Sequence, residues 1–229
     1  MIKKITATVE AITDLSHDTK SFILRAEQPF SFKTGQFVMV NVPFNDITVR
    51  RAYSLASKPD GNIIELCLNY VSGGKGSEYF FKLKEGDKIL IDGPYGVFTV
   101  KDSGMEKFFI CTGTGVVPLR SMIQQLLEHG AKENITLIFG KRAEGDILYR
   151  TEFERLTKIF PNFTYVVTLS RPDGHWKGER GYVQDVMKKF IDKNGEFYIC
   201  GLIEMVCDVR KVLIEMGIAP ENIFAERYV

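Results

Sequence analysis

The distribution of apolar and polar residues along the chain changes near residue 103. Before this point, short apolar runs in partial alternation are separated by turns rich in glycine and proline, a pattern typical of β-strands. The expected strands cover residues 5–13, 20–26, 36–42, 51–55, 63–71 and 89–91, with a short helix over 77–83. Several short strands at this spacing favour an antiparallel barrel or sandwich for the first half of the chain.

From residue 106 onward, buried-strand runs alternate with helical stretches. The expected strands cover 108–111, 135–139, 163–169, 196–200 and 222–225, and the expected helices cover 119–129, 151–159, 182–191 and 203–216. Strands that alternate with helices predict a parallel sheet, here an α/β doubly wound domain. In such sheets ligands bind beyond the carboxyl ends of the strands.

Composition narrows the classes of function. The chain has 229 residues and a formal net charge of +1, without a dense basic cluster, so we expect no nucleic-acid partner. Its apolar runs are too short to span a bilayer, and its N-terminus lacks the apolar core of a secretory signal. The expectation is therefore a cytoplasmic protein of one or two domains.

The cysteine and histidine residues give no sign of a metal centre. The cysteines form no CxxC pair, and the histidines are isolated from one another. These residues are Cys67, Cys111, Cys200, Cys207, His17, His129 and His175. We therefore predict neither a metal site nor an iron–sulfur cluster within this chain.

A cation, a ring and a hydroxyl lie close together in Arg51-Ala52-Tyr53-Ser54. In a strand, Arg51 and Tyr53 share one face, while Ala52 and Ser54 share the other. One face could then offer a charge to a phosphate and a ring to a flat ligand. Taken alone, the tetrapeptide is better explained as an ordinary half-buried strand.

Two glycine-rich segments each precede a predicted helix. In Gly73-Gly74-Lys75-Gly76-Ser77, glycines allow close backbone approach and the helix N-terminus offers free N–H groups to a diphosphate. On local evidence alone, a flexible loop that ends in a serine cap is the better explanation of that segment. Thr112-Gly113-Thr114-Gly115 follows a strand, with Pro118 where a third glycine would stand, and fits either a dinucleotide site or a bare strand–helix junction.

Taken together and in order, these segments resemble the plant-type ferredoxin–NADP reductase family over nearly the whole chain. Arg51-Ala52-Tyr53-Ser54 is similar to its RxYS flavin motif, and Gly74–Ser77 to its GxxS phosphate turn. Gly93-Pro94-Tyr95-Gly96 is similar to the turn that closes its barrel, and Gly113–Ser121 to its nicotinamide-nucleotide motif. Further matches are Leu66-Cys67-Leu68, Ser170-Arg171, Gly178–Gln184 and Tyr198–Leu202.

The resemblance implies two domains, an antiparallel Greek-key β-barrel over 1–103 that binds FAD and a parallel-sheet domain over 104–229 that binds NAD(P). By this likeness Arg51 pairs with the FAD diphosphate, Tyr53 packs on the isoalloxazine, and Ser54 hydrogen-bonds near its reactive nitrogen. The N–H groups at Gly76 and Ser77 complete the phosphate site. The family often has a basic residue where Asn69 stands, so one possible cofactor charge contact is missing.

In the second domain the resemblance places nicotinamide near Cys200 and Gly201. Cys200 is expected to pack and orient rather than to act as a nucleophile, although a small apolar strand residue is the simpler explanation outside the family. Ser54 and Glu226 are the polar groups expected near the flavin. The plant members end in a stacking tyrosine, whereas here Tyr228 is followed by Val229, so stacking and simple terminal packing both stay open.

The choice between NADPH and NADH depends on recognition of the 2′-phosphate. Arg171 and Arg180 could clamp this group, with Ser170 donating a hydrogen bond and Tyr182 stacking on adenine. The alternative is that both arginines are solvated loop charges. No acidic residue stands where it would bind the ribose hydroxyl, which favours NADPH with NADH possible.

The leading hypothesis for function is an FAD-dependent oxidoreductase that takes hydride from NAD(P)H and passes electrons singly to a separate carrier such as ferredoxin or flavodoxin. A second hypothesis is an NAD(P)H:flavin oxidoreductase that releases reduced flavin. A third is a purely electron-relaying subunit of a larger complex. The Gly74–Ser77 segment favours the first over the second, because flavin-releasing enzymes commonly lack GxxS.

Overall fold

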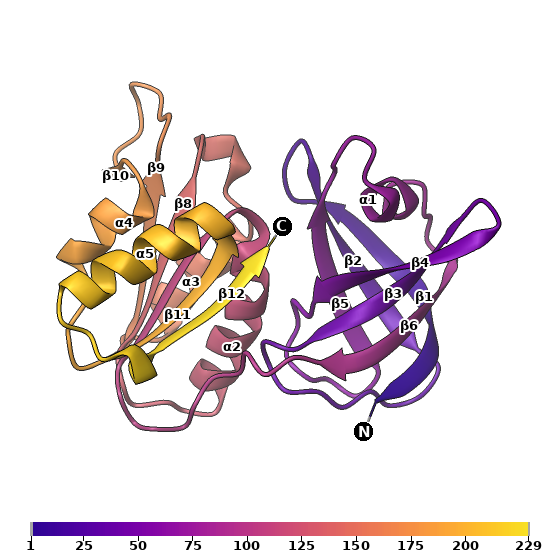
Figure 1. The fold of residues 1–229 in the computed structure, drawn as a ribbon, viewed down its shortest axis with the longest axis horizontal. Helices are drawn as coiled ribbons and strands as arrows, with labels where there is room; N and C mark the ends of the chain where they lie inside the picture. The colour runs from indigo at the N-terminus through magenta and orange to yellow at the C-terminus, as the bar shows by residue number, and fades with distance from the viewer. Residues whose placement is uncertain (1, 229) are drawn as a thin grey trace. The chain divides into compact units, whose positions relative to one another are not determined.

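A computed structural model describes residues 2–228, and the chain divides into two compact units. The first unit comprises residues 1–99 together with 120–122, and the second comprises 100–119 and 123–229. Each unit has its own hydrophobic core, and Figure 1 shows the elements of each.

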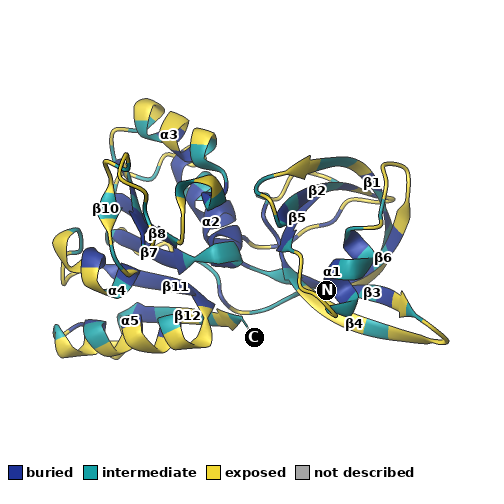
Figure 2. Cartoon of the chain, turned by 90° about the horizontal axis from the view of Figure 1, so that it is seen from above, coloured by how far each residue is buried: buried dark blue, intermediate teal, exposed yellow. Residues whose placement is uncertain are grey.

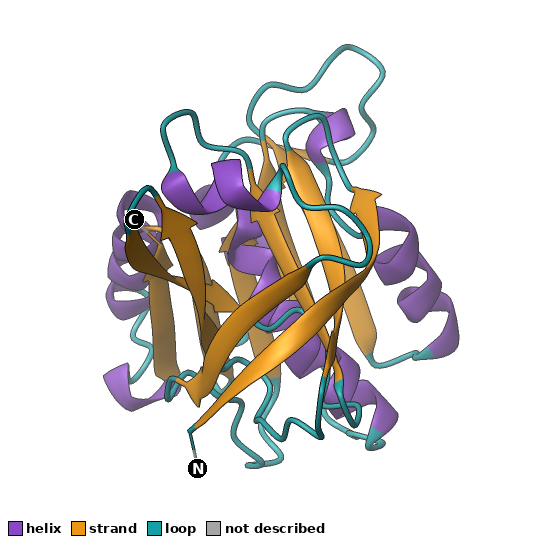
Figure 3. Cartoon of the chain, turned by 90° about the vertical axis from the view of Figure 1, so that its right-hand side faces the viewer, coloured by secondary structure: helices purple, strands orange, loops and turns teal. Residues whose placement is uncertain are grey.

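The first unit is a curled antiparallel sheet of six strands. Its elements are β1 Lys3–Asp14, β2 Thr19–Ala26, β3 Phe37–Phe44, β4 Ile47–Ser54, β5 Ile63–Asn69, α1 Lys75–Phe80 and β6 Lys88–Tyr95. The strand order is β4-β3-β6-β1-β2-β5, and the curl is visible in Figure 3. Because a bridge joins Leu55, just after β4, to Leu66 in β5, the two edges of the sheet meet, and the predicted antiparallel barrel is confirmed.

The core of this unit follows the alternation of the strands. In β1, for example, Ile5, Ala7 and Val9 are buried and the residues between them are less so. The helix α1 begins two residues earlier than predicted and ends at Phe80, whose ring packs edge-on against Phe22 with centroids 5.0 Å apart. This contact fixes α1 against the strands of the curled sheet.

The second unit is a parallel sheet with helices on both faces. Its strands are β7 Lys107–Thr112, β8 Ile135–Lys141, β9 Phe163–Leu169, β10 Glu179–Arg180, β11 Glu196–Leu202 and β12 Ile223–Tyr228. Its α-helices are α2 Val116–Glu128, α3 Arg150–Ile159, α4 Val183–Val186 and α5 Ile203–Glu215, and its short 3-10 turns are η1 Gly113–Gly115, η2 Glu144–Asp146, η3 Met187–Lys189 and η4 Pro220–Asn222.

The strand order β10-β9-β8-β7-β11-β12 confirms the predicted doubly wound sheet. Successive strands move outward from β7 in one direction and from β11 in the other, so the order reverses between these two strands. Helices α2 and α3 cover one face, and α4 and α5 cover the other, as Figures 1 and 2 show. Figure 2 also shows that the central strands are buried while the outer faces of α3 and α5 are exposed. A ligand crevice is expected at the reversal point.

The largest departures from the predicted bounds in the second unit concern α2, the helix predicted over 182–191, and β12. Helix α2 begins at Val116 rather than at 119, because Pro118 lies in its first turn, where a backbone N–H has no helical partner to lose. The helix predicted over 182–191 is instead the single turn α4 followed by η3. Strand β12 extends to Tyr228, three residues beyond its predicted end, which brings that tyrosine into the sheet.

A buried ionic cluster holds the amino ends of the central strands. The ammonium of Lys107 is fully buried, lies 3.1 Å from Glu196 and donates to Ser103 at 2.8 Å and to the Met105 carbonyl at 2.6 Å. The hydroxyl of Tyr198 donates to Glu196 at 2.9 Å. Because each buried charge has several partners, the cluster fixes the segment that leads into β7.

Candidate cofactor-binding sites

The first candidate site lies where β4 meets the N-terminal turn of α1. A β-carbon placed on Gly76 would lie 2.1 Å from the hydroxyl oxygen of Tyr53 and 3.2 Å from Cγ of Arg51. Arg51 and Tyr53 therefore share the face that the strand periodicity predicted. The segments Arg51–Ser54 and Gly74–Ser77 therefore form one site, in which only glycine fits against the tyrosine at position 76.

Tyr53 is held by ring packing. Its ring meets Phe80 edge-on with centroids 4.9 Å apart. Burial raises the pKa of Tyr53 to about 12, and the neighbouring charge of Arg51 offsets only part of this rise. The tyrosine therefore remains a neutral phenol. Arg51 is exposed and its guanidinium donates to the carbonyl of Arg50 at 2.9 Å, so its remaining N–H groups can meet an anion.

The loop before α1 is organised by the hydroxyl of Ser77. This oxygen accepts a hydrogen bond from the Val71 amide at 3.0 Å and lies within 3.0 and 3.1 Å of the Val71 and Gly74 carbonyls. Ser77 is buried, and Gly74 is the residue that precedes the helix. Sequence patterns suggested this hydroxyl as a phosphate donor, but it closes its own loop instead. The backbone N–H groups of the turn are then the donors that could meet a phosphate.

The other predicted residues of this unit lie at strand ends or on the sheet edge. Ser54 is the buried last residue of β4, and Ala52 is exposed on the same edge strand. Asn69 ends β5, and its amide donates to the Tyr70 carbonyl at 3.4 Å.

Sequence patterns missed a polar cluster next to this site. The carboxylate of Asp92 accepts hydrogen bonds from Arg50, from Tyr95 at 2.6 Å and from Asn41 at 3.0 Å. Burial alone would raise the pKa of Asp92, but these three donors together hold it below its usual value. The cluster fixes Arg50, the neighbour of Arg51 on β4. The sequence feature that could have indicated this cluster is the aspartate directly before the Gly93–Gly96 turn.

The second candidate site lies at the carboxyl ends of β7 and β11. A β-carbon on Gly115 would lie 2.1 Å from the carbonyl oxygen of Cys200 and 2.8 Å from the amide nitrogen of Gly201. A β-carbon on Gly201, which has φ +155°, would lie 2.7 Å from the hydroxyl oxygen of Thr112. The two strand ends thus approach each other at the point where the strand order reverses, as a dinucleotide crevice requires.

The rest of the predicted glycine motif forms the turn between β7 and α2. Gly113 has φ +57°, in the left-handed region that favours glycine, and it begins a short 3-10 turn with Thr114. Pro118 is buried in the first turn of α2. The first N–H groups of α2 consequently face the end of the sheet without helical partners.

Three of the predicted functional residues come together on β11 and β12. Cys200 is registered opposite Glu226, and Leu202 is opposite Tyr228. Burial raises the pKa of the Cys200 thiol above its usual range, the carboxylate of Glu226 raises it further, and a hydrogen bond with Tyr228 offsets part of the change. Cys200 therefore remains a buried thiol, unsuited to nucleophilic attack.

Basic residues gather at the carboxyl ends of β8 and β9. The Ser170 amide donates to the Lys141 carbonyl at 3.0 Å, and the Arg171 amide donates to the Arg142 carbonyl at 2.9 Å. The exposed side chains of Arg171 and Arg142 therefore start from neighbouring backbone positions. Sequence patterns missed Arg142, although the Lys141-Arg142 pair directly after a predicted strand was a usable signal.

Arg180 and Tyr182 lie on the segment that borders this basic end. The guanidinium of Arg180 donates to the carbonyls of Trp176 at 2.9 Å and Asp173 at 3.2 Å, so it supports its own loop. Tyr182 is 65% exposed, and its ring is available for stacking.

Residues 2–228 contain neither a cluster of metal-ligating side chains nor a helix suited to cross a bilayer. No group of three or more His, Cys, Asp or Glu side chains there is placed to hold a metal ion. Cys67, Cys111, Cys200 and Cys207 form no disulfide within that range. None of the helices in that range has the length and hydropathy needed to cross a bilayer.

Family models agree with this division of sites. Residues 6–100 match an oxidoreductase FAD-binding domain, and residues 109–211 match an oxidoreductase NAD-binding domain. The chain is 40% identical over 211 residues to ferredoxin–NADP reductase B of Sorangium cellulosum, covering 87% of this chain and 86% of that one. The chain belongs to the ferredoxin–NADP reductase family. It is a flavoprotein oxidoreductase with FAD and NAD(P) as cofactors.

Two further relatives of this reductase define the range of the family. This chain is 36% identical over 230 residues to the reductase component of a phenol 2-monooxygenase from Pseudomonas. The match covers 96% of this chain but 64% of that longer protein. A ferredoxin NADP+ reductase from Neisseria gonorrhoeae, solved with bound FAD and NADP, has the same fold with a TM-score of 0.87 and 21% identity, covering 99% of this chain and 98% of that one.

The residues present fit both cofactors. Gly76 lets the first turn of α1 lie directly against Tyr53 and Arg51, and Gly115 lets the turn after β7 lie directly against the end of β11, since a β-carbon at either position would collide with its neighbour. The first site combines a cation and backbone N–H groups, which suit a diphosphate, with a ring that suits a flat ring system. The reductase therefore transfers electrons from NAD(P)H through FAD to a partner.

Proposed function

We propose that this reductase passes electrons from NADPH, through FAD held by residues 1–103, to a separate small carrier protein such as ferredoxin or flavodoxin. Residues 104–229 hold the nicotinamide nucleotide. The observation that carries the proposal is the close fit of Gly76 against Tyr53 and Arg51, because it joins the two predicted flavin motifs in one site.

In the first unit each residue has a distinct role in binding. Arg51 supplies positive charge to the diphosphate, and the Tyr53 ring provides a rigid stacking surface. The N–H groups at Gly76 and Ser77 complete the phosphate site, while the Ser77 hydroxyl keeps the loop closed. Ser54, at the end of β4, donates a hydrogen bond to the polar edge of the ring system.

Bound FAD supplies the redox chemistry, since it takes two electrons from a reduced nicotinamide and can return them singly. The protein contributes placement and the exclusion of water. Cys200, kept as a thiol by its raised pKa, packs beside the nicotinamide, and the contact of Gly115 with the Cys200 carbonyl sets the depth of the crevice. Glu226 and Tyr228 supply the neighbouring polar and aromatic groups.

We assign the preference for NADPH to the basic end of β8 and β9. Arg171 and Arg142 start from adjacent backbone positions and can both reach a 2′-phosphate, with Ser170 as a further donor. Tyr182 stacks on the adenine. Arg180 acts mainly by supporting the loop that carries this site, because its guanidinium is bonded to two loop carbonyls.

The test uses the full chain purified without added flavin. We expect near-stoichiometric FAD and NADPH-dependent reduction of a ferredoxin or flavodoxin. The Arg51→Ala variant should bind FAD about tenfold or more weakly, because a charge-assisted hydrogen bond contributes about 1.5–3 kcal/mol. Arg25→Ala is the matched control, since Arg25 is an exposed arginine paired with Glu10, and it should bind FAD normally.

Two outcomes would overturn the proposal. A colourless chain that reduces added FAD and releases it would show an NAD(P)H:flavin oxidoreductase instead. A yellow chain that accepts no electrons from either nicotinamide nucleotide would show a relay subunit.

A further inference from the structure

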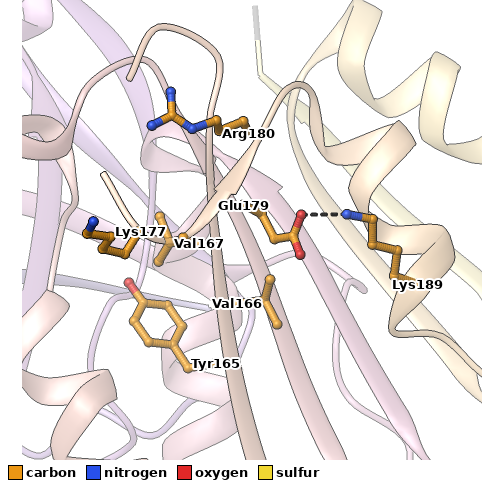
Figure 4. A pocket seen from close by; sticks show the side chains of 8 residues that line it. Tyr165, Val166, Val167, Lys177, Glu179, Arg180 and Lys189 are labelled. Atoms are coloured by element: carbon orange, nitrogen blue, oxygen red, sulfur yellow. Dashed lines mark hydrogen bonds and ion pairs between the residues drawn. The ribbon is translucent and has the colours of Figure 1, made fainter. Parts of the chain in front are cut away.

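The connection from β9 to β10, residues 170–178, is a long loop whose two ends are tied to the second unit. It extends beyond the carboxyl ends of the strands (Figure 1). Near its start the Arg171 amide donates to the Arg142 carbonyl at 2.9 Å. Directly after its end the carboxylate of Glu179 pairs with Lys189 at 2.7 Å (Figure 4). The residues between these anchors lie outside the strands, so other contacts must hold them.

Trp176 lies at the centre of the contacts within this β9–β10 loop. Its indole N–H donates to the Glu179 carbonyl at 2.9 Å. Its ring lies against Gly178, where a β-carbon would be 2.4 Å from a ring carbon. The backbone of Trp176 accepts a hydrogen bond from Arg180 at 2.9 Å and donates one to the Asp173 carboxylate at 3.2 Å. The loop is thus folded around a single indole ring.

Arg150, the first residue of α3, contacts the same ring from a neighbouring segment. Its guanidinium carbon lies 5.8 Å from the centroid of the Trp176 ring, within the range of a cation–π contact. The guanidinium also pairs with Glu144 and, at 2.7 Å, with Glu154. Because two carboxylates hold the guanidinium, the ring contacts a cation that is already positioned.

The contact between Arg150 and Trp176 joins two segments that both carry a basic residue. Arg142 begins the segment that leads from β8 to α3, and Arg171 lies near the start of the β9–β10 loop. The hydrogen bond between their backbones ties the two segments at the sheet, and the cation–π contact ties them again further along. This second tie limits how far the two segments, and the arginine side chains they carry, can separate.

We propose that Arg150 and Trp176 are positioning residues for recognition of the 2′-phosphate of NADPH. Their contact keeps Arg142 and Arg171 at the spacing that one phosphate group requires, and a site organised in advance loses less entropy on binding. Arg150 acts through the loop rather than on the phosphate, because its guanidinium is already bonded to two carboxylates. This inference rests on the proposed preference for NADPH and explains how the fold maintains it.

Steady-state kinetics of the FAD-loaded full chain test the positioning role, with ferricyanide as the acceptor so that the identity of the carrier does not enter. Arg150→Met and Trp176→Leu should each raise KM for NADPH about three- to fivefold, the factor that an exposed cation–π contact contributes. KM for NADH, and kcat with either nucleotide, should stay within about twofold, because only NADPH carries the phosphate.

Three further variants separate the contact from other effects. The double variant Arg150→Met/Trp176→Leu should be no worse than either single change, because both remove the same contact. Trp176→Phe keeps a ring for the cation and should retain most of the preference for NADPH. Arg155→Met removes an exposed arginine elsewhere on α3 and should behave as the unmodified chain does. Trp176→Leu changes no charge, so its effect cannot come from altered electrostatics.

The outcomes distinguish this inference from the function on which it rests. An unmodified chain without preference for NADPH overturns the phosphate assignment and the positioning role together. A preference that persists in both Arg150→Met and Trp176→Leu overturns the positioning role alone. Equal losses with NADPH and NADH, or effects that add in the double variant, also overturn it, because they show a general structural defect or two separate actions.

Discussion

Replacement of Gly115 by alanine tests how closely the two strand ends of the nicotinamide crevice must approach. The backbone of Gly115 has φ −60°, which any residue adopts, so the change introduces no backbone strain. The added β-carbon would lie 2.1 Å from the Cys200 carbonyl oxygen, whereas carbon–oxygen contacts begin at about 3.3 Å. The turn before α2 and the end of β11 must therefore separate by about 1 Å.

Two effects of this separation can be estimated. Overpacking of this kind costs about 1–3 kcal/mol of stability, reduced by the higher helix propensity of alanine, worth up to about 1 kcal/mol. A displacement of about 1 Å at a reacting centre costs on the order of 100-fold in rate. We therefore expect a small fall in melting temperature and a large fall in the rate of flavin reduction by NADPH.

The assay is stopped-flow reduction of the bound FAD, with thermal unfolding measured in parallel. Gly145→Ala is the matched control, because a β-carbon there meets nothing within 4 Å and the backbone needs no positive φ. If Gly115→Ala reduced its flavin as fast as the unmodified reductase, this contact would not set the geometry of the crevice.

Three further predictions address stability and specificity. Lys107→Met should lower stability by about 3–5 kcal/mol, because Glu196 keeps a buried charge without its main partner, and chemical denaturation would measure the loss. The lowered pKa of Asp92 contributes stability that is complete above pH about 4 and lost as the pH falls through the folded-state value. Asp92→Asn should therefore cost stability at pH 7 and progressively less as the pH falls below about 4, as read from melting temperatures, and a cost that does not change with pH would contradict this origin. Arg171→Ala should raise KM for NADPH about tenfold and leave KM for NADH within about twofold, and equal changes in steady-state kinetics would disprove the phosphate contact.

The pattern of apolar residues predicted the antiparallel and parallel sheets correctly, because the burial of one or both faces of a strand determines that pattern directly. The alternation in β1 and the continuous apolar run in β11 reflect one buried face in the first unit and two in the second. The start of α2 was harder to predict, because a proline usually interrupts a helix, although Pro118 is tolerated in the first helical turn.

The candidate sites were predictable where short motifs determine backbone shape. The glycines at 76 and 115 mark close approaches, and both contacts are present. The role of Ser77 was not predictable, because whether its hydroxyl meets a ligand or its own loop depends on where the Val71 backbone lies. Asp92 and Arg142 escaped notice because their partners come from strands that only the fold brings together.

Anaerobic mixing of the purified full chain with NADPH, and separately with NADH, shows whether the chain holds a flavin that nicotinamide nucleotides reduce. We expect the chain to carry FAD whose absorption band bleaches with either nucleotide, and at a lower concentration of NADPH than of NADH. Bound FAD that stays oxidised with both nucleotides would contradict it, as would a chain that retains no flavin.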